Sequence, residues 1–147
     1  MIYLGADHNG YKIKEAIKKY LDQRNMSFVD LGANELVKDD DYPDYAHAVA
    51  SRVIKSKNNR GILLCGSGNG MAIAANRFKG ARAALAWNSR LAKLAASHDH
   101  ANILVIPAWF LGDKSATALT AEWLKTAPSR AARHKRRLAK IDKPDIK

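Results

Sequence analysis

The chain has 147 residues, of which 25 are lysine or arginine and 14 are acidic, so its formal net charge is +11 at pH 7. This length fits one domain over residues 1–147 that buries most of the surface its unfolded form exposes. The sequence has no apolar stretch long enough to span a membrane, and its strand-like start, Met1–Leu4, differs from a secretory leader. A single cysteine excludes an internal disulfide, and we therefore expect a soluble, cytoplasmic protein without a membrane partner.

Short apolar runs alternate with longer segments of helical periodicity along the chain. This alternation predicts an α/β fold: a three-layer αβα sandwich around a Rossmann-like parallel sheet of five strands, with an extra C-terminal helix at about 129–141. The predicted strands are Ile2–Ala6, Ser27–Leu31, Gly61–Cys65, Ala81–Ala86 and Ile103–Ile106. The predicted helices cover Ile13–Leu21, Val49–Ile54, Asn69–Arg77, Ser89–His98, Lys114–Thr126 and Ser129–Lys140, and Gly32–Asp44 is the one long loop.

Polar residues follow two of these strands directly. Asp7 and His8 come after the first strand, and Cys65 ends the third. Ligands of open parallel sheets bind beyond the carboxyl ends of the strands, near the point where the strand order reverses. We therefore expect Asp7, His8 and Cys65 at one edge of the sheet, where His98 would join them if its helix ends there.

Cys65 is followed by a loop, Gly66–Gly70, in which glycine alternates with Ser67 and Asn69. A loop of this kind that leads into a helix directs backbone N–H groups at one spot and favours an anion there. The same groups predict a thiol pKa below the free value of about 8.5, so that Cys65 acts as a base or a nucleophile. The alternative is a buried structural cysteine beside an ordinary turn. The loop has neither the P-loop lysine nor the dinucleotide glycine spacing, which makes nucleotide binding a weak interpretation.

Three further groups of residues are candidates. Asp7 and His8 either cap the first helix or contact a sugar hydroxyl and a phosphate. Pro43 fixes the turn that would present Asp41 and Tyr42 to a pocket. The acidic run 39–41 is more typical of a solvated loop than of a metal site.

His98 and the C-terminal segment carry the other candidates. His98, Asp99 and His100 have no second cluster to complete a zinc site, so a single histidine that donates a proton is the better interpretation. Residues 129–147 hold eight lysines or arginines against two aspartates. Arg133 and Arg137 are four residues apart, so on a helix they share a face and are able to hold one phosphate. A solvated helix face and a nucleic-acid contact are the alternatives.

Taken together, these motifs resemble the ribose-5-phosphate isomerase B family. The residues that carry the resemblance are Gly5–His8, Asp41–Pro43, Cys65–Gly70, Ala74–Asn76, His98, Arg133, His134 and Arg137, and it extends to about Ile141. The resemblance implies interconversion of ribose 5-phosphate and ribulose 5-phosphate in the pentose phosphate pathway, through an enediolate and without a metal or cofactor. Related enzymes act on six-carbon sugar phosphates, so allose 6-phosphate and galactose 6-phosphate are alternative substrates.

The resemblance also implies roles for individual residues. Cys65 would remove the proton alpha to the carbonyl, Ser67 and the loop amides would hold the oxyanion, and His98 would open the furanose ring. The implied substrate-binding residues are Asp7, His8, Asp41, Tyr42, Gly66, Gly68, Asn69, Gly70, Asp99, Arg133 and Arg137. The family's pocket lies between subunits, which implies a homodimer, or a tetramer, in which the arginines serve a partner's cysteine.

Four positions depart from the family pattern. Asp99 replaces a common asparagine, Ser67 replaces threonine, Trp109 lies near a frequent phosphate-binding arginine, and Ala131-Ala132 replaces a glycine pair. A carboxylate near an enediolate opposes the developing charge, so Asp99 would point away, be protonated or contact a different substrate group. We expect no nucleic-acid partner. Two other functions stay open as alternatives: a nucleic-acid-binding module and a sugar-phosphate sensor without turnover.

Overall fold

Five parallel strands form one sheet in the computed structural model of this chain, which describes residues 1–143. The strands are β1 (Ile2–Ala6), β2 (Phe28–Asp30), β3 (Arg60–Cys65), β4 (Ala83–Leu85) and β5 (Ile103–Pro107). Their order in the sheet is β2-β1-β3-β5-β4. The predicted α/β class and five-stranded parallel sheet are therefore confirmed, and the last four residues of the predicted domain 1–147 lie outside the described residues.

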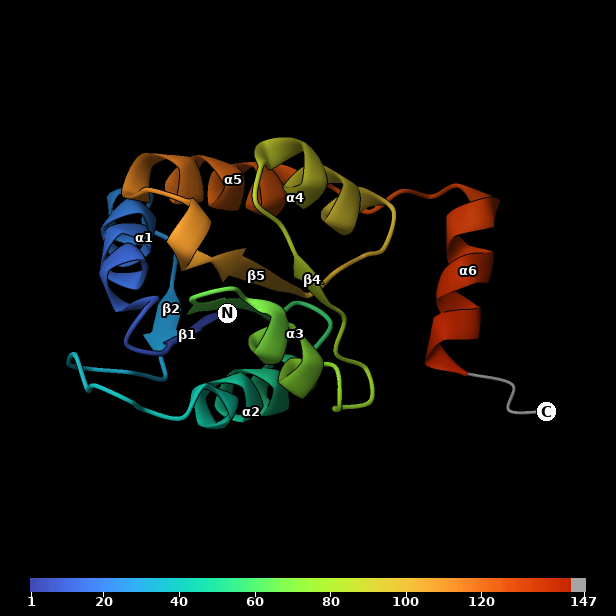
Figure 1. The fold of residues 1–147 in the computed structure, drawn as a ribbon. Coiled ribbons are helices and arrows are strands. Elements are labelled where there is room, and N and C mark those ends of the chain that lie inside the picture. Colours follow the sequence, from blue (N-terminus) through green and yellow to red (C-terminus); the bar gives the residue numbers. More distant parts are fainter. Residues whose placement is uncertain (144–147) are drawn as a thin grey trace.

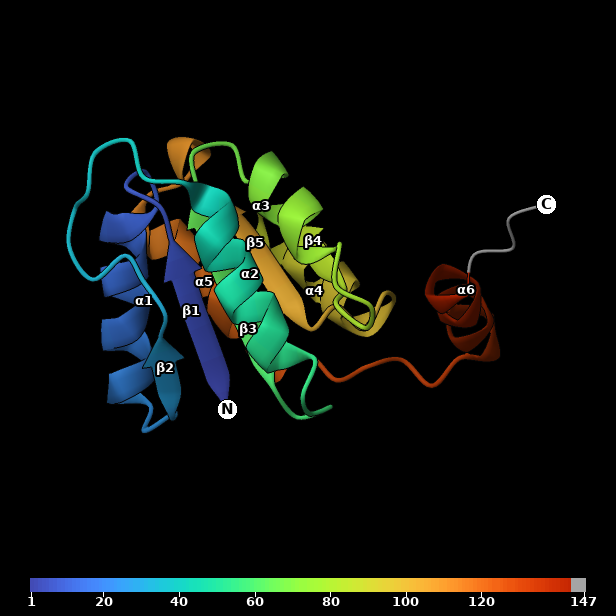
Figure 2. The same ribbon diagram turned by 90° about the horizontal axis from the view of Figure 1, so that it is seen from below.

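Helices cover both faces of this sheet and give the predicted three layers (Figures 1 and 2). The helices are α1 (Tyr11–Gln23), α2 (Tyr42–Val53), α3 (Asn69–Ala75), α4 (Ser89–Ser97), α5 (Asp113–Lys125) and α6 (Ala132–Asp142), and Ala108–Phe110 form the 3-10 turn η1. Helices α1, α4 and α5 lie on one face, and α2 and α3 lie on the other. Within residues 1–143, no helix has both the length and the apolar character that crossing a membrane requires.

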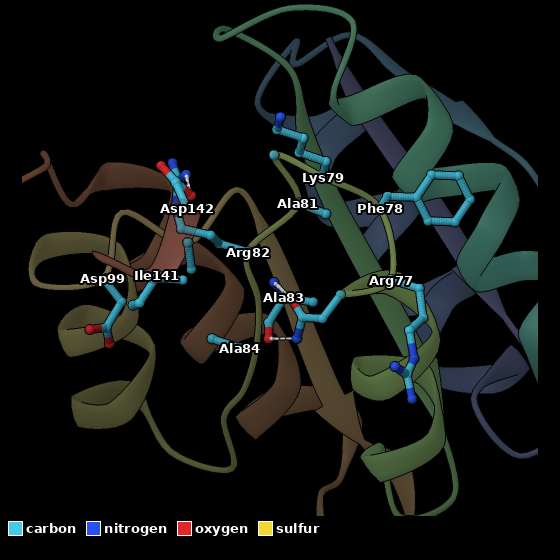
Figure 3. Close-up of a pocket in the computed structure, with 13 residues that line it drawn as sticks. Arg77, Phe78, Lys79, Ala81, Arg82, Ala83, Ala84, Asp99, Ile141 and Asp142 are labelled. Carbon is cyan, nitrogen blue, oxygen red and sulfur yellow. Dashed lines mark hydrogen bonds and ion pairs between the residues drawn. The ribbon is translucent and has the colours of Figure 1, made fainter. Parts of the chain in front are cut away.

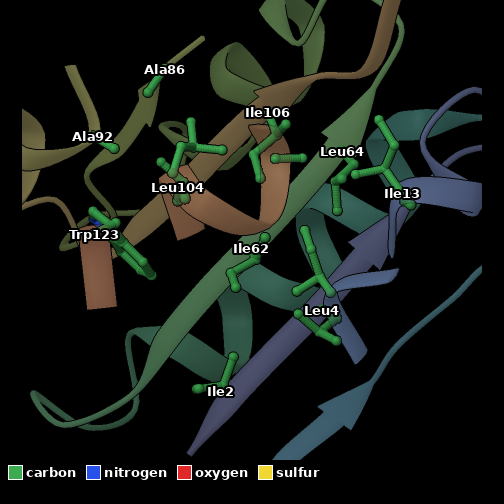
Figure 4. Close-up of a cluster of buried hydrophobic side chains, with 14 of the residues drawn as sticks. Ile2, Leu4, Ile13, Ile62, Leu64, Ala86, Ala92, Leu104, Ile106 and Trp123 are labelled. Atoms are coloured by element: carbon green, nitrogen blue, oxygen red, sulfur yellow. The ribbon is translucent and has the colours of Figure 1, made fainter. Parts of the chain in front are cut away.

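The central strands are apolar along their whole length because both of their faces are covered. In β3, Ile62 and Leu64 pack against the layer of α1, α4 and α5, whereas Leu63 and Cys65 pack against α2 and α3. Figure 4 shows the first of these clusters, which includes Trp123 of α5. This double burial explains why the strands are continuous apolar runs in the sequence and not alternating patterns.

The strand order reverses between β1 and β3. The chain leaves β1 for β2 on one side and later returns to β3 on the other side. Ala6 of β1 is in register with Leu64 of β3, and the Asp7 N–H donates to the Leu64 carbonyl at 3.2 Å. The carboxyl ends of the two strands are therefore neighbours, and this is the place where open α/β sheets bind ligands.

Helix α6 lies beyond the β4 edge of the sheet, at the end of an extended segment (Figures 1 and 2). It begins at Ala132, so the prediction that this helix starts at Ser129 is wrong. The Ser129 N–H donates to the Ser97 carbonyl at 2.8 Å, and the Ser129 hydroxyl accepts the Ala131 N–H. These two bonds hold the segment extended against the end of α4 and delay the helix by three residues.

The predicted loop Gly32–Asp44 is also shorter in the structure. Helix α2 begins at Tyr42, with Asp41 as its N-cap residue, so the loop ends at Asp41. Pro43 stands in the first turn of α2, where its fixed φ angle suits a helix and its missing N–H costs nothing. The proline that was interpreted as fixing a turn instead starts a helix.

A buried ion pair ties the start of this loop to α1. The Lys14 ammonium donates to both carboxylate oxygens of Asp30, at 2.8 and 2.7 Å, and to the Ala33 carbonyl. The Lys14 side chain is fully buried, whereas Lys18, which contacts Asp30 at 2.8 Å, is 27% exposed. Burial opposes ionisation of Asp30, but the two lysines hold its pKa below the ordinary value. The charge of Asp30 is therefore part of what fixes the chain after β2.

Lys14→Met is expected to lower the free energy of unfolding by about 3 kcal/mol, because it removes one partner of a buried charge pair. Lys18→Met is the matched control and is expected to cost less than about 1 kcal/mol, because Lys18 is partly solvated and leaves Lys14 in place. Urea unfolding of both variants measures the difference. Equal losses would contradict the assignment of Lys14 as the main partner.

Candidate active site

Cys65 ends β3 and is 5% exposed. The Gly66–Gly70 loop turns directly over it, and the Gly68 N–H donates to the Cys65 sulfur at 3.2 Å. Gly68 has a φ of +80°, a backbone conformation that residues with a side chain rarely adopt. The predicted convergence of loop N–H groups is therefore present, and it is centred on the thiol.

The predicted lowering of the thiol pKa is wrong for the single chain. Burial raises the pKa of Cys65, and the neighbouring Asp7 carboxylate raises it further. The N–H groups of Gly68, Met71 and Ser67 act in the opposite direction without outweighing burial. Cys65 packs within the apolar cluster between the sheet and the layer of α2 and α3, so the thiolate loses solvation that the loop dipoles replace only in part.

Two aromatic rings lie against the glycine loop. A Cβ atom at Gly66 would overlap the Trp109 indole, and one at Gly70 would overlap the Tyr42 ring. The Trp109 backbone N–H also donates to the Gly66 carbonyl at 3.0 Å. The glycines therefore let two rings lie directly on the backbone beside Cys65, and Tyr42 is at the predicted site.

His8 is held by Asp40, a residue that the sequence analysis did not select. His8 Nδ1 lies 2.6 Å from Asp40 Oδ1, and the His8 backbone N–H donates to the same oxygen at 3.0 Å. The Tyr45 hydroxyl donates to Asp40 Oδ2 at 2.9 Å. The Asp40 side chain is 6% exposed, so it is the buried member of a run whose other acids are exposed. Nothing in three adjacent aspartates distinguishes the one that folds inward.

The His8–Asp40 pair shifts the pKa of both groups. The hydrogen bond to Asp40 is the largest cause of the raised pKa of His8, and the charges of Asp7, Asp40 and Asp39 add to it. Burial opposes ionisation of Asp40, but the backbone and side chain of His8 and the Tyr45 hydroxyl hold its pKa below the ordinary value. The neighbouring acids therefore shift the equilibrium of His8 toward the imidazolium form.

Asp7 has a structural role, but it is not the cap of α1 that was the alternative for it, because the N-cap residue is Gly10 and no side chain caps this helix. One of its carboxylate oxygens accepts the N–H groups of Asn9 and Gly10, both at 3.0 Å, and closes the turn before α1. Asp7 is 4% exposed, and burial raises its pKa. A contact of Asp7 with a sugar hydroxyl stays a prediction.

Asp41 is exposed at the N-cap of α2, near Tyr42.

His98 lies at the opposite end of the sheet, so the prediction that it reaches the edge of Cys65 is wrong within one chain. Helix α4 ends at Ser97, directly before His98 as predicted, but this end of the helix lies at the amino end of β5 and not at the edge of Cys65. Cys65 is in register with Pro107 at one end of β5, and Gly61 is in register with Ile103 at the other. These two ends of β5 are four residue steps apart, which corresponds to about 13 Å along the strand. The sequence predicted where α4 ends, but it did not predict at which end of the sheet this helix terminus lies.

The predicted arginines lie with His98 on this second side. The rings of His98 and His134 are in contact, with centroids 4.2 Å apart and planes tilted by 39°, and Arg133 Nε donates to His134 Nε2 at 3.2 Å. His134 is buried, and burial lowers its pKa together with the charges of His98, Arg133 and Arg137. Its packing role was not predicted, because an isolated histidine on a basic helix does not show which side chain it faces.

A cavity of about 900 Å³ opens beside these residues, between the end of α6 and the segment before β4 (Figure 3). It is lined by Asn76, Arg77, Phe78, Lys79, Gly80, Ala81, Arg82, Ala83, Ala84, Asp99, Ala101, Ile141 and Asp142. Arg82 and Asp142 approach to 3.5 Å across it. Asp99, one of the four positions that depart from the family pattern, lines this cavity and therefore lies on the second side, away from the loop of Cys65 in the same chain.

The structure thus separates the predicted site into two groups. The cysteine half-site contains Asp7, His8, Asp40, Asp41, Tyr42, Cys65, Gly66, Ser67, Gly68, Asn69 and Gly70. The arginine half-site contains His98, Asp99, Arg133, His134 and Arg137. Within residues 1–143, no group of three or more histidine, cysteine or acidic side chains is placed to hold a metal ion.

The fold and the cysteine half-site define a class: α/β proteins with a ligand site at the switch point of a parallel sheet. Comparison with known proteins narrows this class. A family model described as Ribose/Galactose Isomerase matches residues 2–141. Ribose-5-phosphate isomerase B of Mycobacterium tuberculosis is 42% identical over 137 residues, which cover 93% of this chain and 85% of the relative. The chain belongs to the ribose/galactose isomerase family, as its motifs predict.

Solved structures agree with this assignment. The crystal structure of ribose-5-phosphate isomerase B from Mycoplasma genitalium with bound ribulose-5-phosphate is 39% identical, with a TM-score of 0.91, and the match covers 96% of this chain and 93% of that one. A Thermotoga maritima ribose 5-phosphate isomerase is 42% identical, with a TM-score of 0.90, and the match covers 96% of both chains. The similarity therefore spans the whole fold and both half-sites.

Asp40→Asn is expected to lower the pKa of His8 toward its ordinary value of 6.5, because it weakens the hydrogen bond that raises this pKa most. An NMR titration of the His8 ring protons measures the change. Asp39→Asn is the matched control: its carboxylate is exposed and acts on His8 only through space, so its effect is expected to be smaller. A His8 pKa that does not change in the Asp40 variant would show that the pair is not formed.

Proposed function

We propose that this protein interconverts ribose 5-phosphate and ribulose 5-phosphate. The main support is similarity over 96% of the chain to an isomerase whose structure contains bound ribulose-5-phosphate. The lone thiol under the glycine loop is the chain's own support, because an aldose–ketose isomerase needs a base next to donors for an oxyanion. We assign the reaction to the pentose phosphate pathway. Because the thiol must stay reduced, we place the enzyme in a reducing compartment such as the cytoplasm.

Cys65 is proposed as the base. Its thiolate takes the proton from C2 of the open-chain aldose, and the resulting thiol returns this proton to C1 of the enediolate. The proton on O2 passes to O1 in the same interconversion, so that O2 becomes the carbonyl of the ketose. The raised pKa makes the thiolate scarcer, but it also makes it a stronger base toward a carbon-bound proton. The N–H groups of Gly68, Met71 and Ser67 stabilise the thiolate when it forms.

The glycine loop is proposed to hold the oxyanion of the enediolate. Removing one aimed donor of this kind costs about 3 to 4 kcal/mol of transition-state stabilisation in other enzymes. Ser67 contributes its hydroxyl and the backbone of Gly66, Gly68, Asn69 and Gly70 contributes the shape. Tyr42 and Asp41, at the start of α2, would position the sugar, and Asp7 would accept from a hydroxyl.

Phosphate binding is proposed for His8 together with Arg133 and Arg137. Asp40 raises the pKa of His8 and so favours an imidazolium, which suits a dianionic group. The two arginines share a face of α6 but lie with His98 in the arginine half-site. One chain therefore supplies only part of the phosphate site.

We infer that a second copy of the chain completes each site. A two-fold axis would bring the arginine half-site of one copy to the cysteine half-site of the other and would form two equal sites. Trp109 and Phe110, beside the cysteine half-site, are 67% and 71% exposed, as is expected of side chains that a partner covers. His98 then opens the furanose ring of a sugar held by the partner's cysteine half-site, and a homodimer is the smallest active unit.

Cys65→Ala is expected to abolish turnover of ribose 5-phosphate, because it removes the proposed base. Far-UV circular dichroism and thermal melting check that the variant is folded. Turnover of allose 6-phosphate and galactose 6-phosphate by the wild-type protein, measured in parallel, distinguishes five-carbon from six-carbon substrates. Undiminished turnover in the folded variant would refute Cys65 as the base.

Mixing Cys65→Ala and His98→Asn chains is expected to restore activity that neither variant has alone. A heterodimer has one site with both residues intact and one with neither, and random pairing puts half of the chains in heterodimers. The mixture should therefore reach about a quarter of wild-type specific activity after unfolding and refolding together. A mixture of Cys65→Ala chains with Cys65→Ala/His98→Asn chains is the control. If the mixed single variants stay inactive, the site is not shared between subunits.

A further inference from the structure

A series of hydrogen bonds between side chains runs across the carboxyl edge of the sheet. It contains two residues that the proposed mechanism does not use. Asn9 Nδ2 lies 2.9 Å from His8 Nε2, and the Trp109 indole N–H donates to Asn9 Oδ1 at 3.2 Å. On its other side, His8 Nδ1 contacts Asp40 at 2.6 Å. Both ring nitrogens of His8 are therefore engaged, one by the loop before α2 and the other by η1 through Asn9.

The donor and acceptor properties of these groups fix the direction of each hydrogen bond in the series. The indole N–H is only a donor, so Asn9 must present its oxygen to Trp109 and its amide NH₂ to His8. The NH₂ group is also only a donor, so His8 Nε2 must accept and carry no proton. The ring proton then lies on Nδ1 and is donated to Asp40.

We propose that Asn9 and Trp109 are positioning residues that hold His8 in its neutral Nδ1–H tautomer until an anionic ligand displaces the Asn9 amide from Nε2. Trp109 also lies on Gly66 and donates its backbone N–H to the Gly66 carbonyl. The same side chain therefore connects His8 with the loop over Cys65. Neither residue needs to touch the reacting atoms for this role.

The other groups around His8 favour its protonation. Asp7 from the turn after β1 and Asp39 and Asp40 from the loop before α2 all raise its pKa, and Tyr45 of α2 bonds to Asp40. The Asn9 contact acts in the opposite direction, because it needs a lone pair on Nε2. A phosphate that accepts from Nε2–H must break this contact, so anion binding at His8 is coupled to uptake of a proton. The identity of that anion as a sugar phosphate rests on the proposed function.

The test is an NMR titration of His8 in the ligand-free protein, in the wild type and in Asn9→Ala and Trp109→Phe. Asn9→Ala removes the donor to Nε2. Trp109→Phe keeps a ring on Gly66 but frees the Asn9 amide to turn its oxygen toward a protonated Nε2. Each variant is expected to raise the His8 pKa by about half a unit to one unit, the size of one neutral hydrogen bond.

Trp87→Phe is the matched control, because Trp87 is also an exposed tryptophan, at 53%, and lies outside this chain of hydrogen bonds. It is expected to leave the His8 titration unchanged. Nitrogen-15 shifts of the wild-type ring should also report an unprotonated Nε2 above the pKa. An unchanged His8 pKa in both folded variants, or a proton on Nε2 of neutral His8, would overturn the proposal. Because the titration needs no substrate, absence of turnover would contradict the proposed function alone.

Discussion

The parallel pairing of β1 with β3 is the constraint on which the rest of the site depends. It puts the turn after β1, with Asp7, His8 and Asn9, beside the glycine loop that follows Cys65. Parallel strands end at the same edge, and the reversal of strand order leaves the space between these two ends free of a crossing helix. The loop before α2 and the η1 turn then close the edge from both sides, through Asp40 and Trp109.

The same alternation of strands and helices separates the two half-sites. Each helix that follows a strand returns the chain to the amino end of the sheet, so a residue at the end of α4 lies opposite a residue at the end of β3. His98 and α6, which contacts it through His134, are therefore kept from Cys65 of their own chain. The proposed site uses both the thiol and the arginines, and for this reason the proposal includes a second copy of the chain.

Local packing decides the cause of the pKa shift of each of the two central groups, Cys65 and His8. Cys65 is surrounded by apolar side chains on one side and by loop N–H groups on the other, and burial has the larger effect on its pKa. His8 is partly exposed and lies among three carboxylates, and there the hydrogen bond to Asp40 has the larger effect. The thiol and the imidazole thus both have a raised pKa, for opposite physical reasons: loss of solvation in one case and a negative partner in the other.

The sequence by itself determined the sheet, its helices and the loop over Cys65, because apolar periodicity and glycine spacing act over a few neighbouring residues. It also selected Asp7, His8, Arg133 and Arg137 as candidates, since each stands next to a strand end or shares a helix face. Only the tertiary structure decided that Asp40 and not Asp39 faces His8, that burial outweighs the loop dipoles at Cys65, and that His98 lies at the far end. These outcomes depend on which distant segments exclude water from a side chain, and no local pattern encodes that.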